Sequence, residues 1–502
     1  MKKYIILLFA VICLFSACQK EQTIELLDKP IVQRNDDNTT SYTFTAVIAN
    51  DLTDVDTKAT IGRDGAYTWA EGDALRFYKD DATYDTAVVT AVAGSTATIQ
   101  VTSAGSRSDY VYAVYPATAG AGTEAVEEIP AQPYKINFNV RGPIVVADVT
   151  QSGTLQFHHI GSLINIKFTS IPSDTRSLVF KPASAFGYDG TFSFTEGVPS
   201  LTSGGSTAEI VVPVTPQVGE TANDEGNDIT ICVPTVSLAV GFSAALNNAT
   251  DGSGRNLFKK TATTARDLTV GGTSSHTLLN MKSVACVAAT KFYVKTYSDG
   301  TGWDCSGVRL IQAGSNYYET LMNTNASTTY YIYDEFNYDN PTTGYLSSGT
   351  LGDKRLYKFS WNGTSGNCEY MKDETARPWK WGSSAVDNMC ICGSFNSWAD
   401  IEFTYNGNQY WSYETGITLT KDTEYKFKFR LIGSWDNAWA KANVSCVNPG
   451  STQLYGKATH NSTADNTDMT ITVSETGTYA IYANALSLDY SDNPMQFMFE
   501  KK

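Results

Sequence analysis

The aromatic side chains that could do chemistry in this chain are concentrated late in the sequence, where eight of the nine tryptophans lie beyond residue 300. Trp435 and Trp439 belong to the polar segment Gly-Ser-Trp-Asp-Asn-Ala-Trp at 433–439, whose composition predicts a surface loop. The face of an indole packs against the axial C–H bonds of a pyranose ring. Asn437 lies between the two rings and offers hydrogen bonds that could orient a sugar. The segment therefore predicts a surface that recognises sugar rings.

Three further tryptophans are candidates for a similar role. Trp398 either joins this surface or packs in a core, and the sequence leaves both readings open. Trp379 and Trp381 flank one lysine, so an extended backbone places both indoles on the same side. They form either a second platform or a plug between domains. Lys428 and Arg430 alternate with phenylalanines, which predicts a strand with its aromatic rings inward and its cations outward.

Patterns for catalysis and for metal binding are missing from the sequence. We find no framed acid/base pair, no serine nucleophile elbow, no zinc-binding histidine spacing and no phosphate-binding loop. Four histidines leave little material for histidine-based catalysis. We therefore expect that this protein is not an enzyme and that it binds neither a cofactor nor a metal ion. A formal charge of −15 without a Lys/Arg cluster also argues against nucleic acid as a partner.

The cysteines do not form the disulfide framework of a small secreted domain, because those beyond residue 18 are odd in number and widely spread. Cys390 and Cys392 have the i, i+2 spacing that puts both on one side of a strand. They are predicted to be small buried apolar residues rather than a metal-binding pair. One bridge, between Cys305 and Cys368, remains open.

The N-terminus carries a targeting signal. Lys2 and Lys3 precede an apolar run too short to span a membrane, which ends in Leu-Phe-Ser-Ala-Cys at 14–18. This ending resembles a bacterial lipoprotein box, which implies cleavage after residue 17 and acylation of Cys18, including palmitate. Two or more acyl chains suffice for stable anchoring, so the resemblance implies a chain tethered to the outer membrane at the cell surface. An ordinary signal peptide with an incidental cysteine is the alternative.

Period-two alternation dominates the rest of the chain, and no amphipathic helical stretch is sustained. Strands are predicted at 43–49, 74–77, 88–101, 110–115, 163–168, 209–214 and 229–233. The fold class is therefore all-β, with tandem antiparallel β-sandwich domains. The expected divisions are a signal peptide at 1–17, a flexible lipidated stalk at 18–40, sandwiches at 41–162 and 163–286, an aromatic-rich β-module at 287–385 and a final sandwich at 386–502.

Four short motifs follow one another in the first half. They are Trp69-Ala-Glu-Gly72-Asp73, the run from Tyr110 to Pro116, Val-Ala-Asp at 146–148 and Phe-His-His at 157–159. Trp69 is expected to fill a core, and Gly72-Asp73 to form a tight turn. The motifs in this order resemble the fimbrillin family, outer-membrane lipoproteins that build pili of anaerobic two-membrane bacteria.

The fimbrillin resemblance implies assembly with other fimbrial subunits by strand exchange. A protease cuts an early loop after Arg or Lys, the first strand leaves, and a strand of another subunit fills the groove. Candidate cut sites are Arg34, in the stalk, and Lys58 and Arg63, which follow the predicted strand at 43–49. The alternative is that no cut occurs and the subunit stays anchored.

The last module carries a second resemblance. Gly-Ser-Phe-Asn-Ser-Trp at 393–398 resembles the opening of starch-binding modules, and 425–435 is similar to a strand and loop of surface glycan-binding lipoproteins in starch-utilisation systems. Two functions follow as hypotheses. The first is a fimbrial accessory or tip adhesin whose C-terminal aromatic residues bind glycan or another surface ligand. The second is a glycan-capture lipoprotein of a polysaccharide-utilisation system that does not polymerise.

Overall fold

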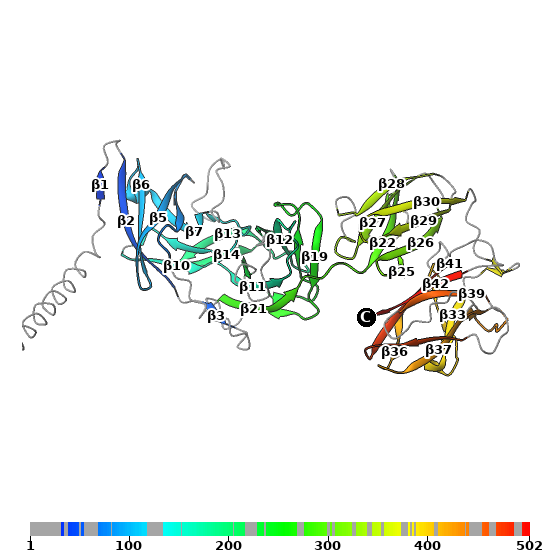
Figure 1. Cartoon of the computed structure of the whole chain (residues 1–502). Coiled ribbons are helices and arrows are strands. Elements are labelled where there is room, and N and C mark those ends of the chain that lie inside the picture. The colour runs from blue at the N-terminus through cyan, green and yellow to red at the C-terminus, as the bar shows by residue number, and fades with distance from the viewer. Residues whose placement is uncertain are drawn as a thin grey trace, which may run out of the picture. The chain divides into compact units, whose positions relative to one another are not determined.

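A computed structural model gives the fold of this chain as nearly all β (Figure 1). It describes residues 32–34, 39–49, 52–54, 69–81, 83–117, 134–151, 153–203, 205–215, 228–234, 237–268, 276–298, 302–303, 307–323, 328–338, 344–352, 356–372, 380–381, 384–385, 388–405, 410–436, 438–440, 454–460, 468–485 and 494–502. Within these ranges, no helix is long and apolar enough to cross a membrane. The chain divides into two compact units, 1–287 and 288–502. The all-β prediction is confirmed.

The first sheet of unit 1 closes around its own core. Its strands are β1 (Val32–Arg34), β2 (Thr40–Ile48), β4 (Ala74–Lys79), β5 (Tyr84–Ala93), β6 (Thr96–Ser103), β7 (Tyr110–Tyr115), β9 (Val145–Asp148) and β10 (Leu155–His159), with the 3-10 turn η1 (Arg107–Asp109) before β7. β2 pairs with β6 on one side and with β10 on the other, so the ladder from β10 through β9, β7, β4, β5 and β6 returns to β2. Phe44, Phe77 and Ile99 lie in the interior.

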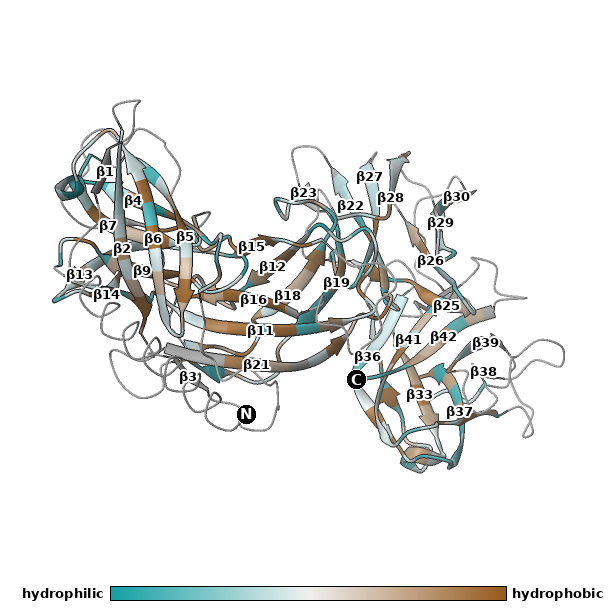
Figure 2. Ribbon diagram, turned by 60° about the vertical axis from the view of Figure 1, so that its left-hand side comes forward, coloured by the Kyte–Doolittle hydropathy of each residue, from teal (hydrophilic) through white to brown (hydrophobic). Residues whose placement is uncertain are grey.

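In the described residues of unit 1, four smaller sheets accompany this first sheet. They comprise β3 (Leu52–Asp54), β8 (Tyr134–Lys135), β11 (Ser162–Thr169), β12 (Ser177–Lys181), β13 (Tyr188–Thr195), β14 (Val198–Ser203), β15 (Ile210–Pro213), β16 (Asp228–Val233), β17 (Ser237–Leu238), β18 (Ser243–Asn247), β19 (Asn256–Thr261), β20 (Arg266–Asp267) and β21 (His276–Ala285). Hydrophobic and hydrophilic residues alternate along β11 (Figure 2). β3 pairs with β21 and β8 with β13, so segments from before residue 162 complete these later sheets.

Unit 2 begins with two sheets. One contains β22 (Phe292–Ser298), β23 (Gly302–Trp303), β24 (Val308–Arg309), β27 (Thr328–Asp334) and β28 (Ser347–Leu351). The other contains β25 (Ile311–Gly314), β26 (Tyr317–Asn323), β29 (Leu356–Trp361) and β30 (Gly366–Lys372). The short pair β31 (Lys380–Trp381) and β32 (Ser384–Ala385) follows. Val294 and Ile332 of the first of these sheets and Phe359 of the second belong to one buried core cluster.

The C-terminal sheet completes unit 2. It is formed by β33 (Met389–Gly393), β34 (Ile401–Glu402), β35 (Thr404–Tyr405), β36 (Tyr410–Leu419), β37 (Glu424–Leu431), β38 (Ala438–Ala440), β39 (Tyr455–His460), β40 (Met469–Thr472), β41 (Gly477–Ala485) and β42 (Pro494–Lys501). Phe427 and Phe429 of β37 point into its core, as the alternation predicted. The opposite face of β37 therefore carries Lys428 and Arg430.

One predicted strand is two strands. The apolar run at 88–101 contains the end of β5 and most of β6, which pair antiparallel. Gly94 takes the left-handed conformation, with φ 63°, in the turn between them. A glycine reaches this conformation without a Cβ clash, so the chain reverses inside a segment whose alternation looks continuous.

Candidate functional site

Trp439 belongs to the core of the C-terminal sheet, so the prediction that it lies on the surface is wrong. It is 1% exposed and packs in the cluster that contains Phe427 and Phe429. Trp439 lies on β38 directly opposite Phe429 of β37, and directly opposed residues share one face of a sheet. The polar composition of 433–439 correctly indicates a turn. The turn ends before β38 begins at Ala438, so it does not include Trp439.

Trp435 lies in that turn, between β37 and β38, and its side chain is 52% exposed. The guanidinium carbon of Arg430 lies 3.7 Å from the centroid of the Trp435 ring. A guanidinium at this distance from a ring face makes a cation–π contact. The indole thus has one face against protein and substantial area open to solvent, which is the arrangement of a stacking platform.

Trp398 stands beside Trp435 and is partly buried. The two ring centroids are 6.3 Å apart, with 54° between the ring planes. The pair therefore forms an angled surface rather than a flat stack. Residues 37 positions apart in the sequence meet because the chain folds back after β33, so that β34 pairs with Cys390 and Ile391, and Cys390 lies opposite Arg430 near the end of β37 that leads to Trp435.

The motif at 393–398 builds the turn that presents Trp398. After the 3-10 turn η4 (Ser394–Asn396), Ser397 and Trp398 both take left-handed conformations, with φ 57° and 64°. Asn396 stabilises the turn by accepting from the Gly393 N–H at 3.1 Å, and the Trp398 N–H donates to the Gly393 carbonyl at 2.8 Å. A Cβ on Gly393 would lie 2.4 Å from the Lys426 carbonyl oxygen, so glycine is required there. The sequence pattern is therefore a device for turning the chain at Trp398.

An ion pair lies behind the two indoles. Asp400 accepts from Arg430 Nε at 2.7 Å, and its Oδ1 lies 2.5 Å from Arg430 Nη2. Cys390 Sγ donates to the same oxygen at 3.0 Å, and the Gly433 N–H donates to Oδ2 at 3.0 Å. Burial would raise the pKa of Asp400, but these hydrogen bonds and the Arg430 charge hold it below its ordinary value of 3.8. Asp400 is thus ionised at neutral pH.

The outer face of β33 and β37 is more covered than an ordinary solvated strand face. Cys390 and Cys392 are both buried, as predicted, and lie opposite Arg430 and Lys428 in the ladder. Burial, then the neighbouring Asp400, raises the pKa of Cys390 well above its ordinary value, so it remains a thiol. Lys428 pairs with Asp468 at 3.2 Å, and Arg430 is 6% exposed. Lys428 and Arg430 therefore each have a carboxylate partner, whereas Lys426 on the same face is exposed.

Sequence reasoning missed Asp400, because no local feature of the sequence indicates its role. An aspartate two residues after Trp398 and an outward arginine on β37 are unremarkable alone. Only the pairing of Cys390 with Arg430 across β33 and β37 shows that the two charges meet. The long-range register of two strands carries this information.

The remaining predicted site residues are placed only in part. Cys18, Lys58, Arg63, Trp379 and Asn437 lie outside the described residues. Trp381 belongs to β31, which pairs with β32. Arg34 ends β1 and lies opposite Thr40 of β2. Of the two cysteines in the bridge left open by the sequence, Cys305 lies outside the described residues, and Cys368 is a free thiol.

The four short motifs of the first half meet in the first sheet of unit 1. Trp69 is 5% exposed, which confirms that it fills a core, and its ring contacts Tyr115 and Phe157 edge to face. Asp73 accepts from the Ala70 N–H at 2.8 Å and from the Tyr115 hydroxyl at 3.2 Å. The motifs therefore define packing and a turn, as expected of a structural signature.

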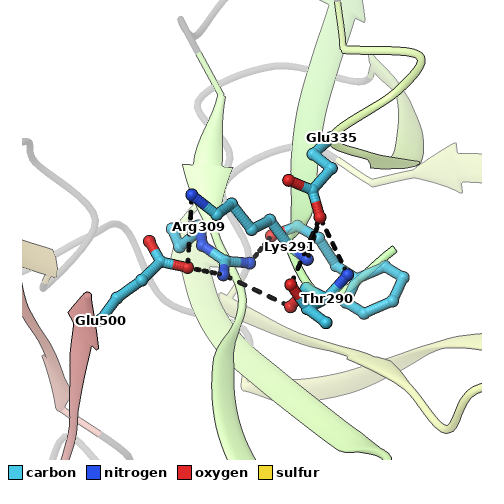
Figure 3. A network of polar contacts seen from close by, with 6 residues as sticks. Thr290, Lys291, Arg309, Glu335 and Glu500 are labelled. Atoms are coloured by element: carbon cyan, nitrogen blue, oxygen red, sulfur yellow. Dashed lines mark hydrogen bonds and ion pairs between the residues drawn. The ribbon is translucent and has the colours of Figure 1, made fainter. Parts of the chain in front are cut away.

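The two parts of unit 2 share an interface that includes a buried ion pair. Arg309 on β24 is 3% exposed and donates to Glu500 of β42 at 2.8 Å (Figure 3). Lys291 approaches the same carboxylate, while Glu335 accepts from the backbone N–H of Thr290 at 2.9 Å. Tyr410 and Met498 of the C-terminal sheet lie in the core of the preceding sheets. The candidate site therefore belongs to a folded body that spans 288–502, and not to an isolated module from residue 386.

Comparisons with known proteins give distant likenesses only. No protein-family description and no curated protein matches the chain. A solved structure described as a cell adhesion protein of Bacteroides ovatus ATCC 8483 is 11% identical, with 45% of this chain and 88% of that chain covered and a TM-score of 0.24. SusF from Bacteroides thetaiotaomicron is 12% identical, with 68% of this chain and 77% of that chain covered and a TM-score of 0.16. Neither score indicates a shared overall fold.

Proposed function

We propose that this chain is a surface lipoprotein that binds an uncharged glycan at Trp398 and Trp435, as a fimbrial accessory or tip subunit. The observation that supports glycan binding is the half-exposed Trp435 ring, which has Arg430 against one face and Trp398 beside it. A pyranose stacks on the open indole face, and polar groups at the rim of the turn orient its hydroxyls.

The charges around the rings favour an uncharged ligand. Arg430 is bound to Asp400 and Lys428 to Asp468, so both cations are already compensated. Asp436, next to Trp435, is exposed and adds a negative charge at the rim. A uronate or a sulfated sugar would therefore meet already paired cations at Arg430 and Lys428 and would be repelled at the rim.

A glycan array with the full chain tests the binding. Removing a stacking indole is expected to weaken affinity roughly ten- to a hundredfold, corresponding to about 1–3 kcal/mol. Trp435→Ala should show this loss, whereas Tyr370→Ala is the matched control, because Tyr370 is a 47% exposed aromatic residue on β30. Binding of a neutral glycan that survives Trp435→Ala unchanged would place the site elsewhere.

The role of the N-terminal half in assembly is the second part of the proposal. β2 bridges β6 and β10 and buries Phe44 and Ala46, so its departure would open a groove along two unpaired strand edges. Cys18 acylation would hold the uncut precursor at the outer membrane, and cleavage at Lys58 or Arg63 would separate this anchor together with β2 and so allow the exchange. A heat-resistant ladder on a denaturing gel after protease treatment is expected. A permanent monomer would favour the alternative, a glycan-capture lipoprotein that does not polymerise.

A further inference from the structure

Asp400 binds both the arginine that lies against the Trp435 ring and the backbone of the turn that carries Trp435. Its Oδ1 accepts from Arg430 and from the Cys390 thiol, and its Oδ2 accepts from the Gly433 N–H. The guanidinium of Arg430 lies against one face of the Trp435 ring, and Gly433 belongs to the turn that carries Trp435. The Asp400 carboxylate therefore binds both Arg430, which contacts the Trp435 ring, and the backbone N–H of Gly433, two residues before Trp435.

The geometry of Arg430 explains why an aspartate is needed here. A guanidinium is planar, so it can bind a carboxylate at its edge while its face lies against an indole. One carboxylate oxygen of Asp400, Oδ1, accepts from both Nε and Nη2 of Arg430, which holds this edge of the guanidinium toward Asp400. Without that anchor, rotation about the arginine side chain would no longer hold its face against the ring.

We infer that Asp400 is the positioning residue of the glycan platform: through Arg430 and Gly433 it fixes the orientation of the Trp435 ring relative to Trp398. The inference rests on the proposed function for its biological meaning, but the ring orientation is measurable without any ligand. Cys390 assists as a neutral thiol donor to the same carboxylate.

Circular dichroism reads the ring orientation directly. Two indoles with centroids 6.3 Å apart and planes at 54° couple their transitions and give a paired positive and negative band in the far ultraviolet. Trp435→Phe and Trp398→Phe define this couplet by difference. Asp400→Asn is expected to reduce it to less than half in a chain that stays folded by its melting curve, and Arg430→Lys should do the same, because an ammonium keeps the charge but loses the planar contact. Cys390→Ser, which keeps a donor, is expected to retain it.

Binding and pH complete the test. With maltoheptaose, cellohexaose and xylohexaose as probes, Asp400→Asn should weaken whichever interaction the unmodified chain shows about tenfold. Because the pKa of Asp400 is lowered, the couplet of the unmodified chain should persist as the pH falls through the ordinary aspartate range near 3.8, and decline only below it. Asp400→Asn should show no such step.

The outcomes separate the two claims. An undiminished couplet in both Asp400→Asn and Arg430→Lys overturns the positioning role, whatever the glycans do. If Asp400→Asn does not fold, Arg430→Lys decides the matter alone by the same criterion. A couplet that responds as expected, in a chain that binds none of the probes, supports the positioning role and counts against the proposed function instead.

Discussion

Trp435 and Trp439 are four residues apart, and the structure predicts opposite consequences when each is replaced by alanine. Trp439 is 1% exposed and Trp435 is 52% exposed. An indole buries roughly 200 Å², and at about 25 cal/mol per Å² this contributes roughly 5 kcal/mol. Core Trp→Ala changes cost about 3–5 kcal/mol, so Trp439→Ala should lower the free energy of unfolding of unit 2 by that amount.

Trp435→Ala removes mainly surface area and one cation–π contact with Arg430. A contact of this kind at an exposed site contributes about 0.5–1 kcal/mol, so the unfolding free energy should fall by about 1 kcal/mol or less. Glycan affinity should nevertheless fall roughly ten- to a hundredfold, because the stacking face is gone. The two variants are thus expected to dissociate stability from binding.

Guanidinium denaturation of the full chain, followed by far-ultraviolet circular dichroism, measures the first quantity, and the glycan array measures the second. Trp439→Ala should lower the midpoint of the transition in which unit 2 unfolds while the folded fraction still binds. If Trp435→Ala costs as much stability as Trp439→Ala, the exposed placement of Trp435 is refuted. If Trp439→Ala leaves the midpoint unchanged and abolishes binding, the assignment of the two rings is reversed.

Three further predictions concern other parts of the chain. Glu500→Gln leaves Arg309 buried without its ion-pair partner and should destabilise unit 2 by about 2 kcal/mol in the same denaturation assay; an unchanged midpoint would show that the pair contributes nothing to the interface. Asp73→Asn weakens the bond from the Tyr115 hydroxyl and should cost about 1 kcal/mol in unit 1, read from its own unfolding transition; no loss would contradict the turn described here. Cys18→Ser should move the chain from the membrane pellet to the soluble fraction after cell lysis, and retention in the pellet would argue against lipid anchoring at this residue.

The strands were predictable where short apolar alternations stand between polar segments. The predicted strand at 110–115 coincides with β7, and that at 229–233 differs from β16 by one residue. The failure at 88–101 came from a single glycine inside a continuous alternation, because a two-residue turn interrupts the pattern too briefly to be read. Trp69 was recognisable as a core residue because a motif surrounds it, and the structure buries it against Tyr115 and Phe157.

The aromatic character of the candidate site was predictable from the sequence, but only some of the residues that form it were. Composition indicated an aromatic-rich segment near 435, and the pattern at 393–398 contained Trp398 but left open whether its ring lies at the surface or in a core. Composition could not separate Trp435 from Trp439, because the turn ends and β38 begins inside one polar segment. It also gave no reason to expect Asp400 beside Arg430, thirty residues away in the sequence.

The sequence by itself determined that the chain is all β, because a period of two residues requires extended strands with one face buried, and it determined which residue types could stack on a sugar. The tertiary structure alone decided which indole faces solvent and which carboxylate holds it in place. That decision depends on the register between β33, β37 and β38, where one residue of shift exchanges the core face for the outer face. Register is set by the packing of the whole sheet, so no single segment of the sequence contains it.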